Sequence, residues 1–358
     1  MKFLPHAFAV GVESLFYLTN RQTCSLHTDP DLFNGRSYSL ESFVNFSTPY
    51  LDHPEEFFTT DVGLDAVCVR EGRHPNASRP SPRDYVEMLM DSPAVTPWRE
   101  NNSVPFKWFR TEQANTVLLF VPGWGRRSQT FEEDMSRRFR RHGVDVALLT
   151  VPFHQARTPA GSFSGEYFIS ANLLLTVENF RAFVAEIRLI TEHLRRSYKR
   201  VGILGMSSGG FHAGLASLCE SFDYFFPVVT GCNLGKIVWH GLNTQHMRRD
   251  LERRGITERE FSRVWKIIDL AALGHHCRAR SVKHYIARYD RVIPVKHQLA
   301  LWRALGKWPR MVLSASHYSS YFYRHSVVDD IVGTIAMSDE GPPARLLLAP
   351  HSRETVIS

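Results

Sequence analysis

The sequence predicts an α/β fold with a mostly parallel central sheet, helices on both faces and a helical lid insertion. From Thr116 onward, short apolar runs alternate with longer amphipathic segments, which is the pattern of parallel strands joined by helices. The 358 residues are enough for one large domain with a full core. The composition, 43% hydrophobic and 22% charged, is that of a folded globular chain.

The N-terminal region, residues 1–103, lacks a sustained helical or strand period and is predicted to wrap the main domain. Near its end we expect a short helix at 83–90 after a proline-rich turn, followed by an inward strand at 104–110. Residues 1–18 are apolar but interrupted, and no small-residue cleavage site follows them. We interpret them as a packed amphipathic segment, with contact to a membrane surface as the alternative.

The main domain is predicted to comprise residues 104–231 and 278–337, with strands and helices in alternation. Acids begin the helix expected at 129–142, arginines end it and Gly143 follows, as helix-dipole and C-cap preferences require. The expected strands are 117–121, 145–151, 201–204, 224–230, 284–289 and 311–315, and the further expected helices are 166–196 and 209–219. Residues 232–277, helical and basic, are predicted to form the lid, and residues 338–358 a flexible tail.

Charge and cysteine content restrict the partners. The net charge of +7 comes mainly from scattered arginine pairs, and Arg137 and Arg138 share a segment with Glu132 and Glu133, which predicts a solvated helix face. We recognise no nucleic-acid-binding motif and expect no such partner. The five cysteines are widely spaced and form no Cys-x-x-Cys pair, which favours a reducing, cytoplasmic location without disulfides or a zinc site.

Residues 205–209 read Gly-Met-Ser-Ser-Gly and match the G-x-S-x-G elbow, in which a strand turns sharply into a helix and presents a serine. An apolar strand precedes the motif and a helix rich in small residues follows it. We therefore interpret Ser207 as a candidate nucleophile and Gly205 and Gly209 as the elbow glycines. The alternative is an ordinary glycine-rich turn between a strand and a helix.

A serine hydroxyl needs a base to take its proton, and the base needs a carboxylate to fix its tautomer. Resemblance to proteins that carry the serine on such an elbow implies the chain order serine, acid, histidine. Asp290 follows one expected strand and His317 follows the last, so both are predicted to reach the same sheet edge as Ser207. Alternatively, Asp290 forms a turn, with Asp269 or Asp223 as the acid.

Two other histidine assignments stay open at this stage. His317 could cap a surface helix, and His212 is expected to pack or meet solvent on the helix after the serine. His275 and His276 form a pair in the lid without a metal-ligand pattern, so we expect neither a metal nor an organic cofactor.

Backbone N–H groups should bind the oxyanion that forms during acyl transfer. The expected donors are the N–H groups of Ser208 and of Trp124, which lies in Pro-Gly-Trp-Gly. Trp124 could instead be only a wall of the acyl pocket.

On the elbow and the positions of Asp290 and His317, the sequence from 104 to 337 resembles the α/β-hydrolase superfamily. The Pro-Gly-Trp-Gly-Arg-Arg and Val-Pro-Phe-His-Gln-Ala-Arg-Thr-Pro strings resemble a little-characterised branch of α/β-hydrolase-domain-containing proteins, which implies lipid or acyl-ester chemistry. Pro122 departs from the pattern, since many members carry histidine before the oxyanion glycine, and this bears on the geometry of that site.

These patterns predict a serine hydrolase that acts on a small-molecule or lipid ester, or on a thioester, through an acyl-serine intermediate. A peptidase or amidase with the same three side chains is one alternative, because fold does not fix the substrate. A non-catalytic binding protein on a hydrolase fold is another. Trp239, Trp265 and the lid arginines are expected to select amphiphilic esters with negative charge. Oligomeric state is not predicted by the sequence.

Overall fold

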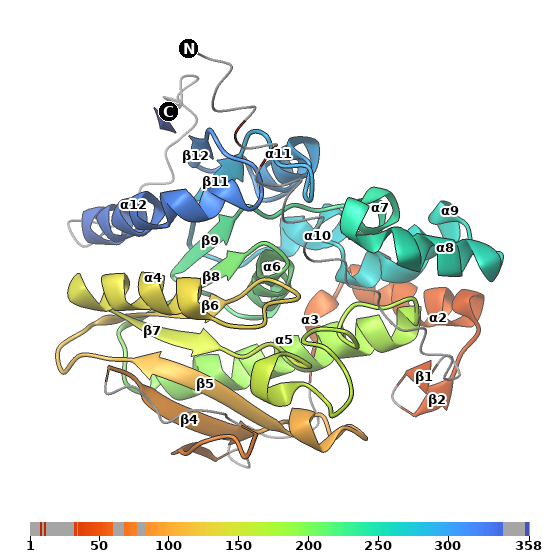
Figure 1. The fold of residues 1–358 in the computed structure, drawn as a ribbon, viewed down its shortest axis with the longest axis horizontal. Coiled ribbons are helices and arrows are strands. Elements are labelled where there is room, and N and C mark those ends of the chain that lie inside the picture. Colours follow the sequence, from red (N-terminus) through yellow and green to blue (C-terminus); the bar gives the residue numbers. More distant parts are fainter. Residues whose placement is uncertain are drawn as a thin grey trace.

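A central sheet organises the chain in the computed structural model, which describes residues 8, 11, 32–33, 35–59, 68–76, 84–338 and 355–357 (Figure 1). Within these residues the sheet has eleven strands, in the order β13-β12-β11-β9-β8-β6-β7-β5-β4-β3, with β10 paired to β9. The strands are β3 Val69–Glu71, β4 Val86–Asp91, β5 Ser103–Phe109, β6 Thr116–Val121, β7 Val144–Leu149, β8 Arg200–Met206, β9 Tyr224–Val228, β10 Ser281–Val282, β11 His284–Ala287, β12 Arg310–Leu313 and β13 Thr355–Ile357.

β6 to β13 all pair with one another in parallel. Beyond β7, the strands β5, β4 and β3 continue the sheet in antiparallel pairs. Parallel strands all end at one edge, so the loops after β6, β8, β11 and β12 can meet there. A separate hairpin is formed by β1 Leu32–Phe33 and β2 Arg36–Ser37.

Alternate residues of the central strands divide the core between the two faces of the sheet. Leu118 and Phe120 of β6 pack on one face, against α4 Thr130–Arg141 and α12 Arg324–Met337. Val117 and Leu119 pack on the other, against α5 Leu173–Arg195 and α6 Gly209–Cys219. Because both faces are covered, these strands read as continuous apolar runs, which is why the sequence predicted them.

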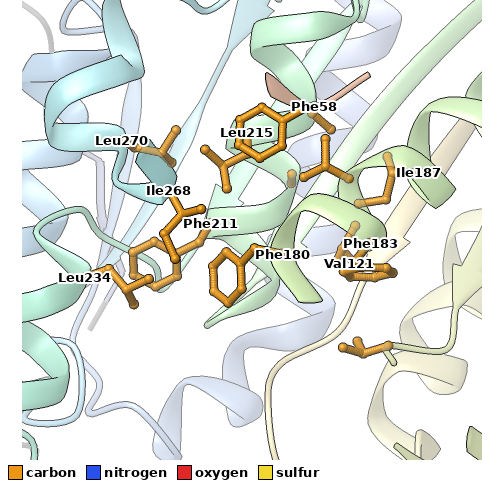
Figure 2. Packing of buried hydrophobic residues seen from close by; sticks show 14 of the residues in the cluster. Phe58, Val121, Phe180, Phe183, Ile187, Phe211, Leu215, Leu234, Ile268 and Leu270 are labelled. Carbon is orange, nitrogen blue, oxygen red and sulfur yellow. The ribbon is translucent and has the colours of Figure 1, made fainter. Parts of the chain in front are cut away.

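The helix after the elbow, α6, is buried on all sides. Figure 2 shows Phe211 of this helix close to Phe180 of α5, with Leu234 and Ile268 on its other flank. These two residues belong to segment 232–277, which was predicted as a lid and is called the lid region below. A Cβ at Gly214 would overlap Leu270, so the small residues of α6 allow this close approach. The helix that follows Ser207 is therefore held rigidly between α5 and the lid region.

The remaining elements are the helices of the lid region and further helices elsewhere in the described chain. The lid region contains α7 Leu234–His240, η5 Leu242–Thr244, α8 Gln245–Arg253, α9 Glu258–Val264, η6 Trp265–Ile268, α10 Leu270–Leu273 and η7 Gly274–His276. The others are α2 Leu40–Ser47, η1 Thr48–Leu51, α3 Pro54–Phe57, η3 Arg99–Asn101, η4 Gln155–Arg157, α11 Val295–Ala304 and η8 Ser319–Tyr323. In Figure 1, α2 lies below α8 and α9, and α2 contacts α9.

The predicted helix at 83–90 is wrong: residues 86–91 form β4, which pairs antiparallel with β5. Met88, Leu89 and Met90 are all buried, and Glu87, just before them, forms an ion pair with Arg73. Pairing with β5 overrides the helix propensity of Glu, Met and Leu. Two strands of the region expected to wrap the domain, β3 and β4, thus belong to the sheet itself.

The other predicted strands and helices are confirmed within a few residues, with one exception. The long helix expected from 166 begins at Leu173, where the Asn172 side chain accepts the Leu175 N–H as an N-cap. Of the expected tail, residues 355–357 form β13 against β12, and 339–354 lie outside the described residues. The N-terminal segment 1–18 also lies outside them, apart from residues 8 and 11. No helix within the described ranges has the length and apolar character needed to cross a bilayer.

Candidate active site

Ser207 occupies the sharp turn between β8 and α6. Its φ of 55° is left-handed, and its N–H donates to the Val228 carbonyl at 2.9 Å. A Cβ at Gly205 would lie 2.5 Å from Gly210 Cα, and one at Gly209 would overlap the Val121 carbonyl oxygen. Only glycine fits at both positions, so the predicted elbow is present and holds Ser207 in a strained conformation.

The structure brings the three predicted side chains together. Ser207 Oγ lies 2.8 Å from His317 Nε2, and His317 Nδ1 lies 2.8 Å from Asp290 Oδ2. Asp290 follows β11 and His317 follows β12, two parallel strands that end at the same edge as β8. A carboxylate only accepts, so Nδ1 carries the ring proton and Nε2 accepts the hydrogen bond from the Ser207 hydroxyl.

Asp290 is held in place by donors on both carboxylate oxygens. Oδ1 accepts the N–H groups of Val292 and Ile293 at 2.8 Å each, and Oδ2 accepts Gln298 Nε2 at 2.9 Å. The Asp290 side chain is 0% exposed, so these donors replace the water that would otherwise solvate its charge. Sequence reasoning missed Gln298, and its only signal is a polar residue within a mostly buried face of α11.

The lid region contacts the residue beside the candidate base. Tyr318 packs edge-on against the His317 ring at 5.4 Å between centroids, and Asn243 of η5 donates to the Tyr318 hydroxyl at 3.1 Å. Ser320 donates to the His317 carbonyl at 2.6 Å. The position of His317 is therefore linked to both η8 and the lid region.

The alternative acids have other partners. Asp269 accepts the N–H groups of Asn233 and Leu234, and Asp223 accepts the Val201 N–H and pairs with Arg280. The carboxylate that is hydrogen-bonded to His317 Nδ1 is therefore that of Asp290, and not that of Asp269 or Asp223.

The other histidines that drew attention lie apart from this chain of hydrogen bonds. His212 is buried against Phe180, 4.2 Å between ring centroids, and hydrogen-bonds the Ser208 carbonyl through Nδ1. Burial lowers its pKa to about 3, so it remains neutral. His276 bonds the Leu51 carbonyl and its ring lies 4.0 Å from that of His275. No group of three potential metal ligands occurs among the residues that the structure describes.

The two expected oxyanion donors belong to backbone near Ser207. Within the described part of the chain, neither the Ser208 N–H nor the Trp124 N–H has a hydrogen-bond acceptor. A Cβ at Gly123 would lie 3.2 Å from Ser207 Cβ and 3.6 Å from its Oγ, so this loop runs directly beside the serine. The Trp124 indole donates to the Gly165 carbonyl at 2.8 Å, which ties the side chain to a neighbouring loop.

The two tryptophans expected to select substrate lie inside the lid region. Trp265 is 0% exposed, packs on Phe261 at 4.3 Å between centroids, and donates to the Leu173 carbonyl at 3.1 Å. Trp239 is also buried, with the Arg248 guanidinium 5.8 Å from its ring centroid. Both rings belong to the hydrophobic core on the α5 and α6 face of the sheet, so they pack the lid region against the rest of the chain.

Comparison with known proteins gives a short sequence match and broad structural ones. No family model matches the chain. Over 98 residues it is 24% identical to "Uncharacterized protein YdjC" of Bacillus subtilis, which covers 27% of this chain and 84% of that protein. An acetyl xylan esterase from Paenibacillus sp. R4 superposes with a TM-score of 0.56 at 13% identity, covering 89% of this chain and 98% of that one.

Acetyl xylan esterase 1 from Thermoanaerobacterium sp. JW/SL YS485 gives a TM-score of 0.53 at 13% identity, covering 78% of this chain and 92% of that one. At this identity such likenesses establish the fold and nothing finer. Combined with the strand order and the elbow between β8 and α6, they show that the chain has the fold of the α/β-hydrolase superfamily.

Proposed function

We propose that this chain is a serine hydrolase that cleaves carboxylic esters through an acyl-serine intermediate at Ser207. The observation that carries the proposal is the unbroken chain of hydrogen bonds from the Ser207 hydroxyl through His317 to Asp290, with 2.8 Å at each step. A hydroxyl, a neutral imidazole and a buried carboxylate in this order are what activation of a serine requires.

In the acylation step, His317 Nε2 takes the proton of Ser207 Oγ as Oγ bonds to the ester carbonyl carbon. The carbonyl oxygen becomes an oxyanion and accepts the N–H groups of Trp124 and Ser208. When the tetrahedral adduct collapses, the bond to the leaving oxygen breaks, and His317 returns its proton to that oxygen to release the alcohol.

In the deacylation step, His317 takes a proton from water, whose oxygen attacks the acyl carbon. Collapse of the second adduct breaks the bond to Ser207 Oγ, which regains its proton from His317, and the carboxylic acid leaves. The Val292 and Ile293 N–H groups hold the Asp290 carboxylate in place, and it stabilises the imidazolium that forms twice in each cycle.

An ester is the substrate class to test first. The two superposed enzymes are acetyl xylan esterases by name, and an acetyl ester needs only a small acyl pocket. Longer acyl chains and thioesters use the same chemistry, so a series of p-nitrophenyl esters from acetate to palmitate separates short-chain from lipid-like preference. A matched acyl anilide distinguishes an esterase from an amidase, because the three side chains alone serve both.

Labelling with a fluorophosphonate tests the proposal directly, since the probe modifies an activated serine hydroxyl. We expect wild type to label, Ser207→Ala not to label, and His317→Ala to label far more slowly. The same variants should lose hydrolysis of the preferred ester. Equal labelling of wild type and Ser207→Ala would overturn the proposal.

A further inference from the structure

The loop that carries the proposed Trp124 donor is clamped by a second loop, residues 152–165. Four hydrogen bonds join the two loops. The Trp124 indole donates to the Gly165 carbonyl at 2.8 Å, and the Gly125 N–H donates to His154 Nε2 at 2.8 Å. The Arg126 carbonyl accepts Ser164 Oγ at 2.6 Å and also the side-chain amide of Gln155.

The contacts of His154 fix its tautomer. Nδ1 lies 2.7 Å from the Pro152 carbonyl oxygen, which can only accept, so Nδ1 carries the proton. Nε2 then presents a lone pair, and it is this lone pair that accepts the Gly125 N–H. The side chain is fully enclosed, so water does not compete for either nitrogen.

We propose that His154 is a positioning residue for ester hydrolysis: its neutral imidazole accepts the Gly125 N–H and thereby orients the preceding Trp124 N–H toward the oxyanion. The inference rests on the proposed function. Consecutive peptide groups share one Cα, so holding the peptide of Gly125 restricts the rotation of the peptide that bears the Trp124 N–H. A preorganised donor stabilises the transition state without reorganising during the reaction.

Backbone strain on both sides of His154 supports this role. Phe153 has φ of 63° and Gln155 has φ of 46°, and neither is glycine. Such conformations cost on the order of 1–3 kcal/mol each and persist only where surrounding contacts impose them. Here the Phe153 N–H donates to Asn101 Oδ1 at 2.7 Å and its carbonyl accepts the Gly165 N–H at 2.7 Å.

A buried ion pair anchors the same loop to α5. The Arg157 guanidinium donates to both carboxylate oxygens of Glu186, at 2.7 and 2.8 Å, and each side chain is 1% exposed. Arg157 also donates to the Thr150 and Asn101 carbonyls. His154 therefore projects from a loop with little freedom to move, as a fixed acceptor requires.

The groups that face His154 keep it neutral. Burial lowers the pKa of His154 to about 4, and the positive charge of Arg157 acts in the same direction. His212 lies near enough for the two rings to disfavour each other's protonation, and burial keeps it neutral too. If Nε2 of His154 were protonated, its N–H would point at the Gly125 N–H, and the hydrogen bond between the two residues would be lost.

Three variants separate positioning from stability. In His154→Leu the acceptor is lost, and we expect kcat to fall about 10²-fold with KM changed by no more than about threefold. In His154→Gln the side-chain oxygen reaches the place of Nε2, and we expect kcat within about tenfold of wild type. His284→Leu is the matched control, since His284 is equally buried but begins β11 at the opposite sheet edge; its kcat should be unchanged. Equal kcat losses in His154→Leu and His284→Leu, or in His154→Leu and His154→Gln, would overturn the inference.

A measurement independent of activity is ¹⁵N NMR of His154 and Gly125. We expect a protonated Nδ1 and an unprotonated Nε2 at neutral pH, with a slowly exchanging Gly125 amide that exchanges faster in His154→Leu. A proton on Nε2, or an unchanged Gly125 amide, would contradict the positioning role even if esters are hydrolysed at Ser207. If instead Ser207→Ala hydrolysed esters as fast as wild type, the proposed function would fail, and the inference with it.

Discussion

Ser207 stands between two sets of contacts that are built differently. On one side, the acid–base arm, His317 and Asp290, joins side chain to side chain. On the other, the loop arm, residues 122–126 and 152–165, uses side chains to hold backbone amides. In the reaction that we propose, the reacting groups of the first arm are the side chains themselves, whereas each side chain of the second arm acts through a peptide group.

The difference predicts how each arm responds to substitution. Removing a group of the acid–base arm abolishes or misaligns the proposed proton transfer between Ser207 and His317, so the loss should be large and specific to the rate of reaction. A change in the loop arm shifts a donor without removing it, because the N–H belongs to the main chain. Its effect should be smaller and should depend on geometry.

The largest effect is expected for Asp290→Asn. The amide would present N–H groups to His317 Nδ1 and favour the tautomer that leaves Nε2 unable to accept the serine proton, so kcat should fall about 10⁴-fold. Steady-state kinetics on the preferred p-nitrophenyl ester, with circular dichroism as the folding control, measure this. A folded variant with kcat within about tenfold of wild type would contradict the role of the acid–base arm.

An intermediate effect is expected for Gly165→Ala. Gly165 has φ of +90°, and a Cβ there would lie 2.6 Å from His154 Nε2 and 3.0 Å from Trp124 Nε1. Displacing these groups should lower kcat about 10²-fold, the range of one lost oxyanion donor. Gly161→Ala is the control, since φ is +82° and nothing lies within 4 Å of its Cβ. Similar kcat in the two variants would mean that the clamp is irrelevant to the reaction.

A smaller loss is expected for Gln298→Met. The substitution keeps the volume but removes one donor from Asp290, while the Val292 and Ile293 N–H groups remain. One hydrogen bond to a charged group is worth about 1.5–3 kcal/mol, so kcat should fall roughly tenfold or more if Asp290 shifts. Gln298→Glu should be worse, because it places like charges together. Unchanged kcat in both variants would show that Asp290 needs no support from α11.

The smallest effect concerns stability against pH. His154 is neutral in the folded chain down to about pH 4, whereas an unfolded histidine takes up a proton near 6.5. The unfolded state therefore binds more protons, and the stability contribution of His154, complete above pH 6.5, is lost as pH falls toward 4. Urea unfolding at pH 7, 5.5 and 4 should show a shallower loss for His154→Gln than for wild type. Parallel pH profiles would place the His154 pKa near its ordinary value.

Sequence predicted the acid–base arm because its chemistry resides in side-chain types, placed after buried strands in a fixed chain order. The strands β6 and β8 could also be predicted from the sequence, because burial on both faces leaves few polar residues in them. Most contacts of the loop arm could not be predicted from the sequence. Every residue but proline has an N–H, so the sequence offers donors everywhere, and only the fold brings His154 to Gly125, 29 residues away.

The errors have the same physical origin. The β4 segment carries good helix formers, and only pairing with β5 selects the strand. Gln298 supports Asp290 from α11, eight residues later in the chain, at a distance that no local pattern encodes. Features fixed by local composition were predictable, whereas those that depend on tertiary contacts were not.

Rapid-quench mass spectrometry of the protein mixed with p-nitrophenyl acetate tests most directly whether Ser207 carries the acyl group. An acyl-serine intermediate predicts a transient mass increase of one acetyl group, mapped to the peptide at Ser207, that forms with the burst of p-nitrophenol and decays with turnover. It also predicts no adduct in Ser207→Ala. Ester turnover without an adduct, or an adduct on another residue that persists in Ser207→Ala, would contradict the claim.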